Sequence, residues 1–206
     1  MATKSPKLFE SLRSMTAMTV TTVSLTLAAA SGASAATVFG FQDAYDPINW
    51  TLTNSNADGF VDTSGAPASI SLTGGDNGSD NFGTTDYTTT AAAAGTVTFD
   101  WDYSTDDDAP LYDPFGYLLN GSFIQVTDDG GGVVQNGTAT FNVLAGDSFG
   151  FSIATFDNFF GRGSVTISNF SAPGPVAPTP VPEPSTVLSL LVLGGLGAGL
   201  KYLNRN

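Results

Sequence analysis

The chain has 206 residues and a formal net charge of −13, and it contains neither histidine nor cysteine. Without these side chains it cannot assemble a Ser-His-Asp or Cys-His catalytic apparatus, and it cannot form a disulfide. The strong negative charge also argues against nucleic acid as a partner, because carboxylates and phosphates repel each other.

The N-terminal segment has the pattern of a secretory signal peptide. Its basic residues come first and are Lys4, Lys7 and Arg13. A stretch rich in apolar residues and threonine follows at 15–30, and the small residues Ala33 and Ala35 then form a cleavage site. We therefore expect residues 1–35 to be a signal helix and the exported chain to begin at Ala36. An uncleaved N-terminal helix is the alternative.

Residues 36–172 are expected to form a single all-β domain. Short alternating runs are separated by Gly and Asp clusters, and no helical period persists. The clearest strand is 95–103, where four apolar side chains alternate with Thr and Asp. Asn120-Gly121 is typical of a tight hairpin turn. Roughly eight or nine such strands predict an antiparallel β-sandwich, jelly-roll-like in its connections.

The alternation also predicts where the other strands lie and which side chains form the core. The other strands are expected at 37–41, 48–53, 68–73, 116–119, 122–127, 138–144, 149–153 and 163–170, with an edge strand at 86–90. The expected core residues are Phe99, Trp101, Phe141, Phe149, Phe151, Ile153, Val165 and Ile167.

The most distinctive interior stretch, residues 99–121, combines aromatic and acidic side chains. Its later carboxylates are Asp106, Asp107, Asp108 and Asp113. Carboxylate oxygens on a loop at the edge of a sandwich suit Ca²⁺, although their spacing is not that of an EF-hand. The composition favours a solvated acidic loop, and calcium binding at these residues is the alternative. No other cofactor is expected.

The same stretch carries three tyrosines that are candidates for sugar contact: Tyr103, Tyr112 and Tyr117. Tyrosine is often half-exposed, and aromatic rings stack on sugars while nearby Asp and Asn side chains bond to hydroxyl groups. Trp101 and Phe115 have similar rings, but the alternation assigns them to the core. Ordinary packing is the alternative role for the three tyrosines.

The C-terminal part begins with a linker and ends in an apolar segment. Residues 173–181 are rich in proline and are expected to be extended. The next four residues are Pro182, Glu183, Pro184 and Ser185. An uncharged apolar run follows, and we expect a transmembrane helix at 187–203 with Lys201 and Arg205 marking its cytoplasmic end.

This arrangement resembles the PEP-CTERM sorting signal of exported bacterial proteins, and the resemblance covers residues 182–206. It implies recognition by an exosortase, a membrane-embedded enzyme similar to a cysteine transpeptidase that cuts near the Pro-Glu-Pro motif. It also implies insertion into the membrane before processing and later delivery to the cell surface or an exopolysaccharide matrix. A plain membrane anchor after a proline-rich linker is the alternative interpretation.

These patterns favour a non-enzymatic exported protein with a structural or adhesive role, associated with extracellular polysaccharide. The alternative is a sugar-binding sandwich, with or without calcium dependence, that uses the loop from Tyr103 to Tyr117. A glycan-acting enzyme with paired aspartates is the third hypothesis, but nothing in the sequence singles out one pair.

Overall fold

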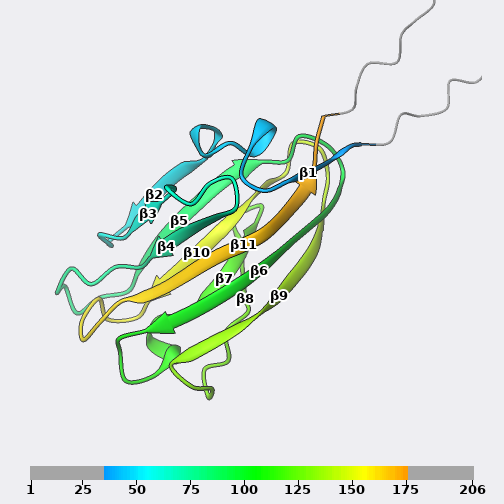
Figure 1. Cartoon of the computed structure of the whole chain (residues 1–206). Coiled ribbons are helices and arrows are strands. Elements are labelled where there is room, and N and C mark those ends of the chain that lie inside the picture. The colour runs from blue at the N-terminus through cyan, green and yellow to red at the C-terminus, as the bar shows by residue number, and fades with distance from the viewer. Residues whose placement is uncertain (1–34, 176–206) are drawn as a thin grey trace, which may run out of the picture. The chain divides into compact units, whose positions relative to one another are not determined.

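The computed structural model describes residues 35–175, which form two antiparallel β-sheets packed face to face (Figure 1). The first sheet contains, in spatial order, β3 (Phe60–Asp62), β4 (Ser69–Thr73), β11 (Gly163–Pro173), β6 (Gly95–Thr105) and β9 (Val134–Val143), and β1 (Thr37–Phe39) pairs with the end of β11. The second sheet contains β2 (Thr51–Ser55), β5 (Gly83–Thr90), β10 (Ser148–Thr155), β7 (Phe115–Leu119) and β8 (Ser122–Gln125). Short 3₁₀ turns lie at Asp43–Tyr45, Pro47–Asn49 and Pro110–Tyr112. The predicted all-β, antiparallel sandwich is confirmed.

Three strands differ clearly from the sequence prediction, and one of them, β3 at Phe60–Asp62, was not predicted at all. The segment 86–90, expected to be an edge strand, belongs to β5, which lies between β2 and β10. It is central because Tyr87 and Thr89 are buried against the core despite the polar composition around them. β2 starts at Thr51 rather than 48, because Pro47–Asn49 forms a 3₁₀ turn capped by Asp46, whose side chain accepts a hydrogen bond from the Ile48 amide.

Several predicted segments lie outside the described residues. These are residues 1–34 of the predicted signal peptide, most of the linker, the motif at 182–185, the helix expected at 187–203 and its basic residues at 201 and 205. Within 35–175, no helix is both long and apolar enough to cross a membrane. The boundaries proposed for these segments stay predictions.

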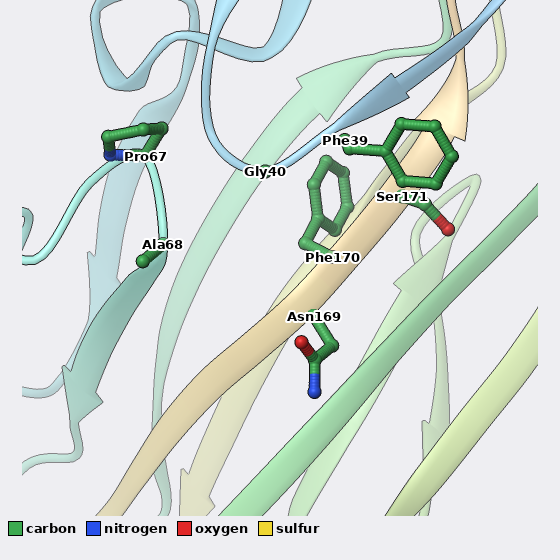
Figure 2. Close-up of a pocket in the computed structure, with 7 residues that line it drawn as sticks. All are labelled: Phe39, Gly40, Pro67, Ala68, Asn169, Phe170 and Ser171. Atoms are coloured by element: carbon green, nitrogen blue, oxygen red, sulfur yellow. The ribbon is translucent and has the colours of Figure 1, made fainter.

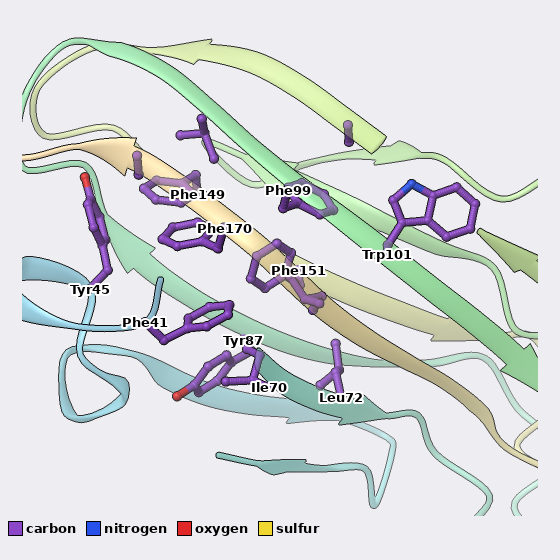
Figure 3. Close-up of a cluster of buried hydrophobic side chains, with 14 of the residues drawn as sticks. Phe41, Tyr45, Ile70, Leu72, Tyr87, Phe99, Trp101, Phe149, Phe151 and Phe170 are labelled. Atoms are coloured by element: carbon purple, nitrogen blue, oxygen red, sulfur yellow. The ribbon is translucent and has the colours of Figure 1, made fainter. Parts of the chain in front are cut away.

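The core between the sheets is built mainly from aromatic rings (Figure 3). All eight residues that alternation assigned to the core are buried. Trp50 lies among them, with its ring stacked on Tyr87 at a centroid distance of 5.0 Å and on Phe151 at 5.4 Å. Its indole Nε1 donates a hydrogen bond to the Tyr45 carbonyl at 3.0 Å, so burying this polar atom leaves no donor unsatisfied.

A β-bulge in β11 brings one more ring into this core. Val165 and Ile167 point inward, so strict alternation would also turn Asn169 inward. Instead the register with β6 shifts between Ser168 and Ser171, and Asn169 adopts a positive φ of 48°. The extra residue restores the inward direction at Phe170, which stacks on Phe41 at 4.8 Å.

We expect Phe151→Ala to destabilise the domain by about 3–5 kcal/mol, because the substitution leaves a cavity where the two sheets meet. Phe151 has no exposed surface and contacts Phe41, Trp50, Phe99 and Phe170. Equilibrium unfolding in urea measures the change. Phe39→Ala is the matched control, since that ring is 68% exposed and its loss should cost less than about 1 kcal/mol. Equal losses in the two variants would contradict the assigned core.

Candidate functional site

The outer face of the second sheet carries a groove of about 330 Å³. Its lining comes from β5, β10, β7, β8 and the residues at their ends: Phe82, Thr84, Asp86, Pro114, Leu118, Gly121, Phe123, Gln125, Ser152, Ala154 and Phe156. These residues are far apart in the sequence, and the antiparallel pairing of the four strands brings them together.

The groove is hollow because of the alternation along β10. Phe149, Phe151 and Ile153 point into the core, so Ser152 and Ala154 point to the outer face. Both outward residues are small and lie beneath larger neighbours, and Ser152 is only 1% exposed. A sheet face with small central side chains and large flanking ones is concave.

Aromatic rings border the groove. Phe82 precedes β5 and Phe156 follows β10, and their rings meet edge to face at a centroid distance of 5.7 Å. They are 55% and 54% exposed, so each leaves much of its apolar surface in water. Phe123 on β8 lies over Gly116, where a Cβ atom would come within 2.8 Å of the ring. Clustered exposed rings of this kind are typical of binding surfaces.

A carboxylate lies on the floor between these rings. Asp86 Oδ1 accepts a hydrogen bond from the Ser152 hydroxyl at 2.5 Å, which fixes its orientation. Its other oxygen has only a long contact with the Thr84 hydroxyl, at 3.5 Å. The groove therefore combines apolar ring faces with a charged hydrogen-bond acceptor that has bonding capacity to spare.

The first sheet carries two further hollows. One, of about 550 Å³, lies between the β1 end, Pro67 and the β11 bulge, with the exposed Phe39 ring at its border (Figure 2). The other, of about 340 Å³, is polar and is lined in part by Asp100 and Asn169. The Asp100 carboxylate is already satisfied by the Thr138 hydroxyl at 2.5 Å and the Asn169 amide at 2.8 Å. Neither hollow combines several exposed rings with an open acceptor.

The tyrosines named from the sequence lie in different surroundings. Tyr103, expected to be half-exposed, is 2% exposed, and its hydroxyl donates to the Asp113 carbonyl at 2.9 Å. Tyr117 is half-buried and stacks on Phe141 at 4.2 Å. Tyr112 is 37% exposed, and its carbonyl accepts a hydrogen bond from the Phe156 amide at 2.8 Å. Of the three tyrosines, only Tyr112 is exposed to solvent, and it lies beside the end of the groove.

The four aspartates named as candidate calcium ligands divide into two pairs. Asp106 and Asp108 are exposed, as expected of a solvated loop. Asp107 and Asp113 are 6% and 1% exposed, and in the part of the chain that the structure describes each has one carboxylate oxygen without a hydrogen-bond partner. Within residues 35–175, no three Asp, Glu, His or Cys side chains are grouped as metal ligands. A cation here would also need neutral oxygen ligands.

Burial raises the pKa of Asp113 to about 6, against the opposing effect of the Thr105 and Thr155 hydroxyls beside it. The negative charges of Asp107 and Asp157 raise this pKa further. Burial is also the main cause of a raised pKa at Asp107, which the nearby Asp157 charge reinforces. These carboxylates therefore share one region of the fold that holds more negative charge than its hydrogen bonds compensate.

Sequence reasoning missed the groove residues Phe82, Asp86, Phe123 and Phe156. Asp86 was placed on an edge strand, and no short motif links it to Ser152, which is 66 residues away. A usable signal does exist, because Phe123 alternates with Ile124 and so points away from the core. Large apolar residues on the solvent side of an alternating strand indicate a binding face.

Residues 180–205 match the model of a family described as the PEP-CTERM protein-sorting motif. The tail carries this sorting motif. The match confirms the resemblance read from the Pro-Glu-Pro residues, the apolar run and the basic end. A PEP-CTERM motif implies an exported protein that is sorted through recognition by an exosortase. A comparison with curated proteins gave no match.

Among solved structures, the sandwich is similar to several carbohydrate-binding modules. A family 35 module from Clostridium thermocellum shares 14% identity over 65% of this chain and 98% of its own, with a TM-score of 0.35. The module TmCBM27, described for specific mannan recognition, shares 11% sequence identity with this chain. That match covers 67% of this chain and 98% of the module, with a TM-score of 0.39. A module of Cellvibrio mixtus lichenase 5A in complex with cellotriose shares 15% sequence identity with this chain. That match covers 66% of this chain and 97% of the module, with a TM-score of 0.31. At these values the likeness concerns the β-sandwich architecture alone.

We expect the free energy of unfolding of the metal-free chain to fall as pH rises from about 4 to about 7. The pKa of Asp113 is raised from 3.8 to about 6 on folding, so the folded state binds the extra proton in this interval and loses that advantage above it. Urea unfolding at a series of pH values in EDTA measures the slope. Asp113→Asn should reduce the fall by on the order of 1–3 kcal/mol. An unchanged slope in this variant would contradict the assignment.

Proposed function

We propose that this exported protein is a non-enzymatic, polysaccharide-binding component of the cell surface or of an exopolysaccharide matrix, with a structural or adhesive role. The observation that carries the proposal is the groove on the second sheet, where the exposed rings of Phe82 and Phe156 lie beside the Asp86 carboxylate. The sorting motif supports the location, because it belongs to proteins that are exported.

The groove has the chemistry that a sugar ring requires. The C–H face of a pyranose packs on an aromatic ring, while its hydroxyl groups donate hydrogen bonds to a carboxylate. The volume of about 330 Å³ is at the lower end of the range for ligand pockets, about 300–1,000 Å³. A short section of a glycan chain would therefore fill the groove, and the rest would remain in solvent.

The charge of the domain favours a neutral glycan. Arg162 is the only basic residue between positions 35 and 175, against 17 aspartates. Polysaccharides that carry carboxylate or sulfate groups would be repelled by this surface and would find no second base to pair with. A neutral polysaccharide meets neither obstacle.

Binding is better supported than catalysis. Glycoside hydrolysis normally uses a pair of carboxyl groups about 5–9.5 Å apart, and Asp86 is the single acidic residue that lines the groove. The chain has no histidine or cysteine to serve as an alternative base or nucleophile.

Affinity electrophoresis of the full chain through gels that contain neutral polysaccharides tests the proposal. We expect retardation by at least one neutral polysaccharide, weakened about 10–100-fold by Phe156→Ala or Phe82→Ala, since each change removes a ring that would be buried on binding. Asp86→Asn should also weaken binding, because it removes the charged acceptor.

Phe39→Ala provides the control, because it removes a ring that is at least as exposed from the opposite sheet. The proposal fails if wild-type and groove variants bind alike while circular dichroism shows that all are folded. Release of new reducing ends from a bound polysaccharide would contradict the non-enzymatic assignment.

Intact mass spectrometry of the native protein tests its location and processing. We expect an extracellular species that begins at Ala36 and ends near residues 182–185, because an exosortase would cut near the Pro-Glu-Pro motif. A chain that retains Asn206 and occurs only in membranes would instead indicate a permanent anchor.

A further inference from the structure

Among residues 35–175, four buried side-chain oxygens have no hydrogen-bond partner. One is Thr85 Oγ1, and the other three, at one end of the sandwich, are Asp107 Oδ2, Asp113 Oδ1 and Asn158 Oδ1. The residues that carry these three oxygens are 6%, 1% and 0% exposed. Leaving a buried acceptor unpaired destabilises a fold, and the cost is greater for a charged acceptor. Natural domains seldom accept this cost three times in one place unless something absent from the chain itself satisfies the atoms.

A hydrogen-bond network joins the three residues into one cluster. The Thr105 hydroxyl donates to Asp113 Oδ2 at 2.7 Å and accepts from the Asp107 amide at 3.1 Å. The Thr155 hydroxyl also lies beside the Asp113 carboxylate, and it accepts from the Asn158 amide at 3.0 Å. Asp113 is thus one hydroxyl group away from each of the other two residues.

The remaining polar atoms of these side chains are already bonded. Asp107 Oδ1 accepts from the Asp108 amide at 2.5 Å. The Asn158 Nδ2 group donates to the carbonyls of Asn56 and Asn81, at 2.9 and 2.8 Å. These two bonds fix which end of the amide is the oxygen. The three unpaired oxygens are therefore the atoms that the protein leaves available.

The backbone of neighbouring loops closes tightly around the cluster. A Cβ atom at Gly161 would lie 2.7 Å from the Asp107 amide nitrogen, so the loop after β10 contacts the loop after β6 directly. A Cβ atom at Gly75 would lie 2.5 Å from Asn158 Oδ1. Glycine at both positions allows an approach that any other residue would block, and it keeps the Asn158 oxygen free of contact with a side chain.

No cationic side chain among residues 35–175 is available to these oxygens. Arg162 is the one base in this range, and its guanidinium forms an ion pair with Asp58 at 2.7 Å and donates to the Gly74 carbonyl at 2.7 Å. The charges that raise the pKa of Asp107 are those of Asp157, Asp108 and Asp76, all negative. The cluster therefore needs a cation that the chain does not provide.

We propose that Asp107 Oδ2, Asp113 Oδ1 and Asn158 Oδ1 bind a calcium ion. Two carboxylates balance its charge, and an amide oxygen is a common neutral ligand for it. Calcium takes six to eight oxygen ligands in a flexible geometry, so backbone carbonyls and waters would complete the shell. The oxygen-only ligands do not suit zinc, and magnesium holds its waters too strongly for a site this buried.

The ion would fasten the loop after β6 to the loop after β10. These are the loops that carry Tyr112 and Phe156, whose backbones are hydrogen-bonded at 2.8 Å beside the groove. The proposal rests on the unpaired oxygens and holds whether or not the groove binds a glycan.

The test is thermal unfolding of the full chain, purified in detergent, stripped with EDTA and then titrated with CaCl₂. We expect a saturable rise in Tm of roughly 5–10 °C at high occupancy. Isothermal titration calorimetry should show one ion per chain. MgCl₂ at the same concentration should produce a much smaller rise.

Asp113→Asn and Asp107→Asn should abolish the calcium-dependent rise. Both variants should remain folded in EDTA, and Asp113→Asn should be at least as stable as the wild type there, because it removes an uncompensated buried charge. Asp106→Asn is the matched control, since it removes the same charge from an exposed neighbour and should keep the full rise. No rise in the wild type, an equal rise with Mg²⁺, or a full rise in Asp113→Asn and Asp107→Asn would overturn the proposal.

Discussion

Strand β10 lies at the centre of the second sheet, and its alternation decides what both faces of that sheet can do. Phe149, Phe151 and Ile153 point inward and bury apolar surface that stabilises the sandwich. Ser152 and Ala154 point outward, and their small size leaves the outer face hollow. A shift of pairing by one residue would expose the rings and fill the groove. Burial of the inward-facing rings therefore fixes the strand register that leaves the groove open.

The sequence was sufficient for the fold class because alternation is a local signal. The strand that contains Phe99 and Trp101 could be recognised from neighbouring residues alone. Two features could not. The bulge that turns Phe170 inward depends on pairing between β11 and β6, which are about 70 residues apart. The composition of β5, which is mostly Thr, is typical of an edge strand, yet tertiary pairing places it inside the sheet.

The candidate sites were harder to predict because each one joins distant segments. The acidic stretch contains Asp107 and Asp113, but nothing in the neighbouring sequence distinguishes them from the exposed Asp106 and Asp108. What distinguishes them is burial, which the loop after β10 provides by contact at Gly161. Asn158 belongs to that loop and lies 45 positions beyond Asp113, so no spacing rule could include it. The groove likewise joins residues that are far apart in the sequence, such as Asp86 and Ser152.

The acidic composition is consistent with a chain whose destination is outside the cell. With no cysteine available, disulfides cannot tie the end loops together, and the single base in the domain is already paired with Asp58. The proposed ion would connect these loops only where the calcium concentration is high. Calcium sites in extracellular modules have dissociation constants of about 10⁻⁴–10⁻³ M. Before export, where free calcium is far scarcer, such a site would stay empty and its carboxylates would repel each other. The carboxylates that would weaken these loops before export would thus stabilise them once the ion is bound.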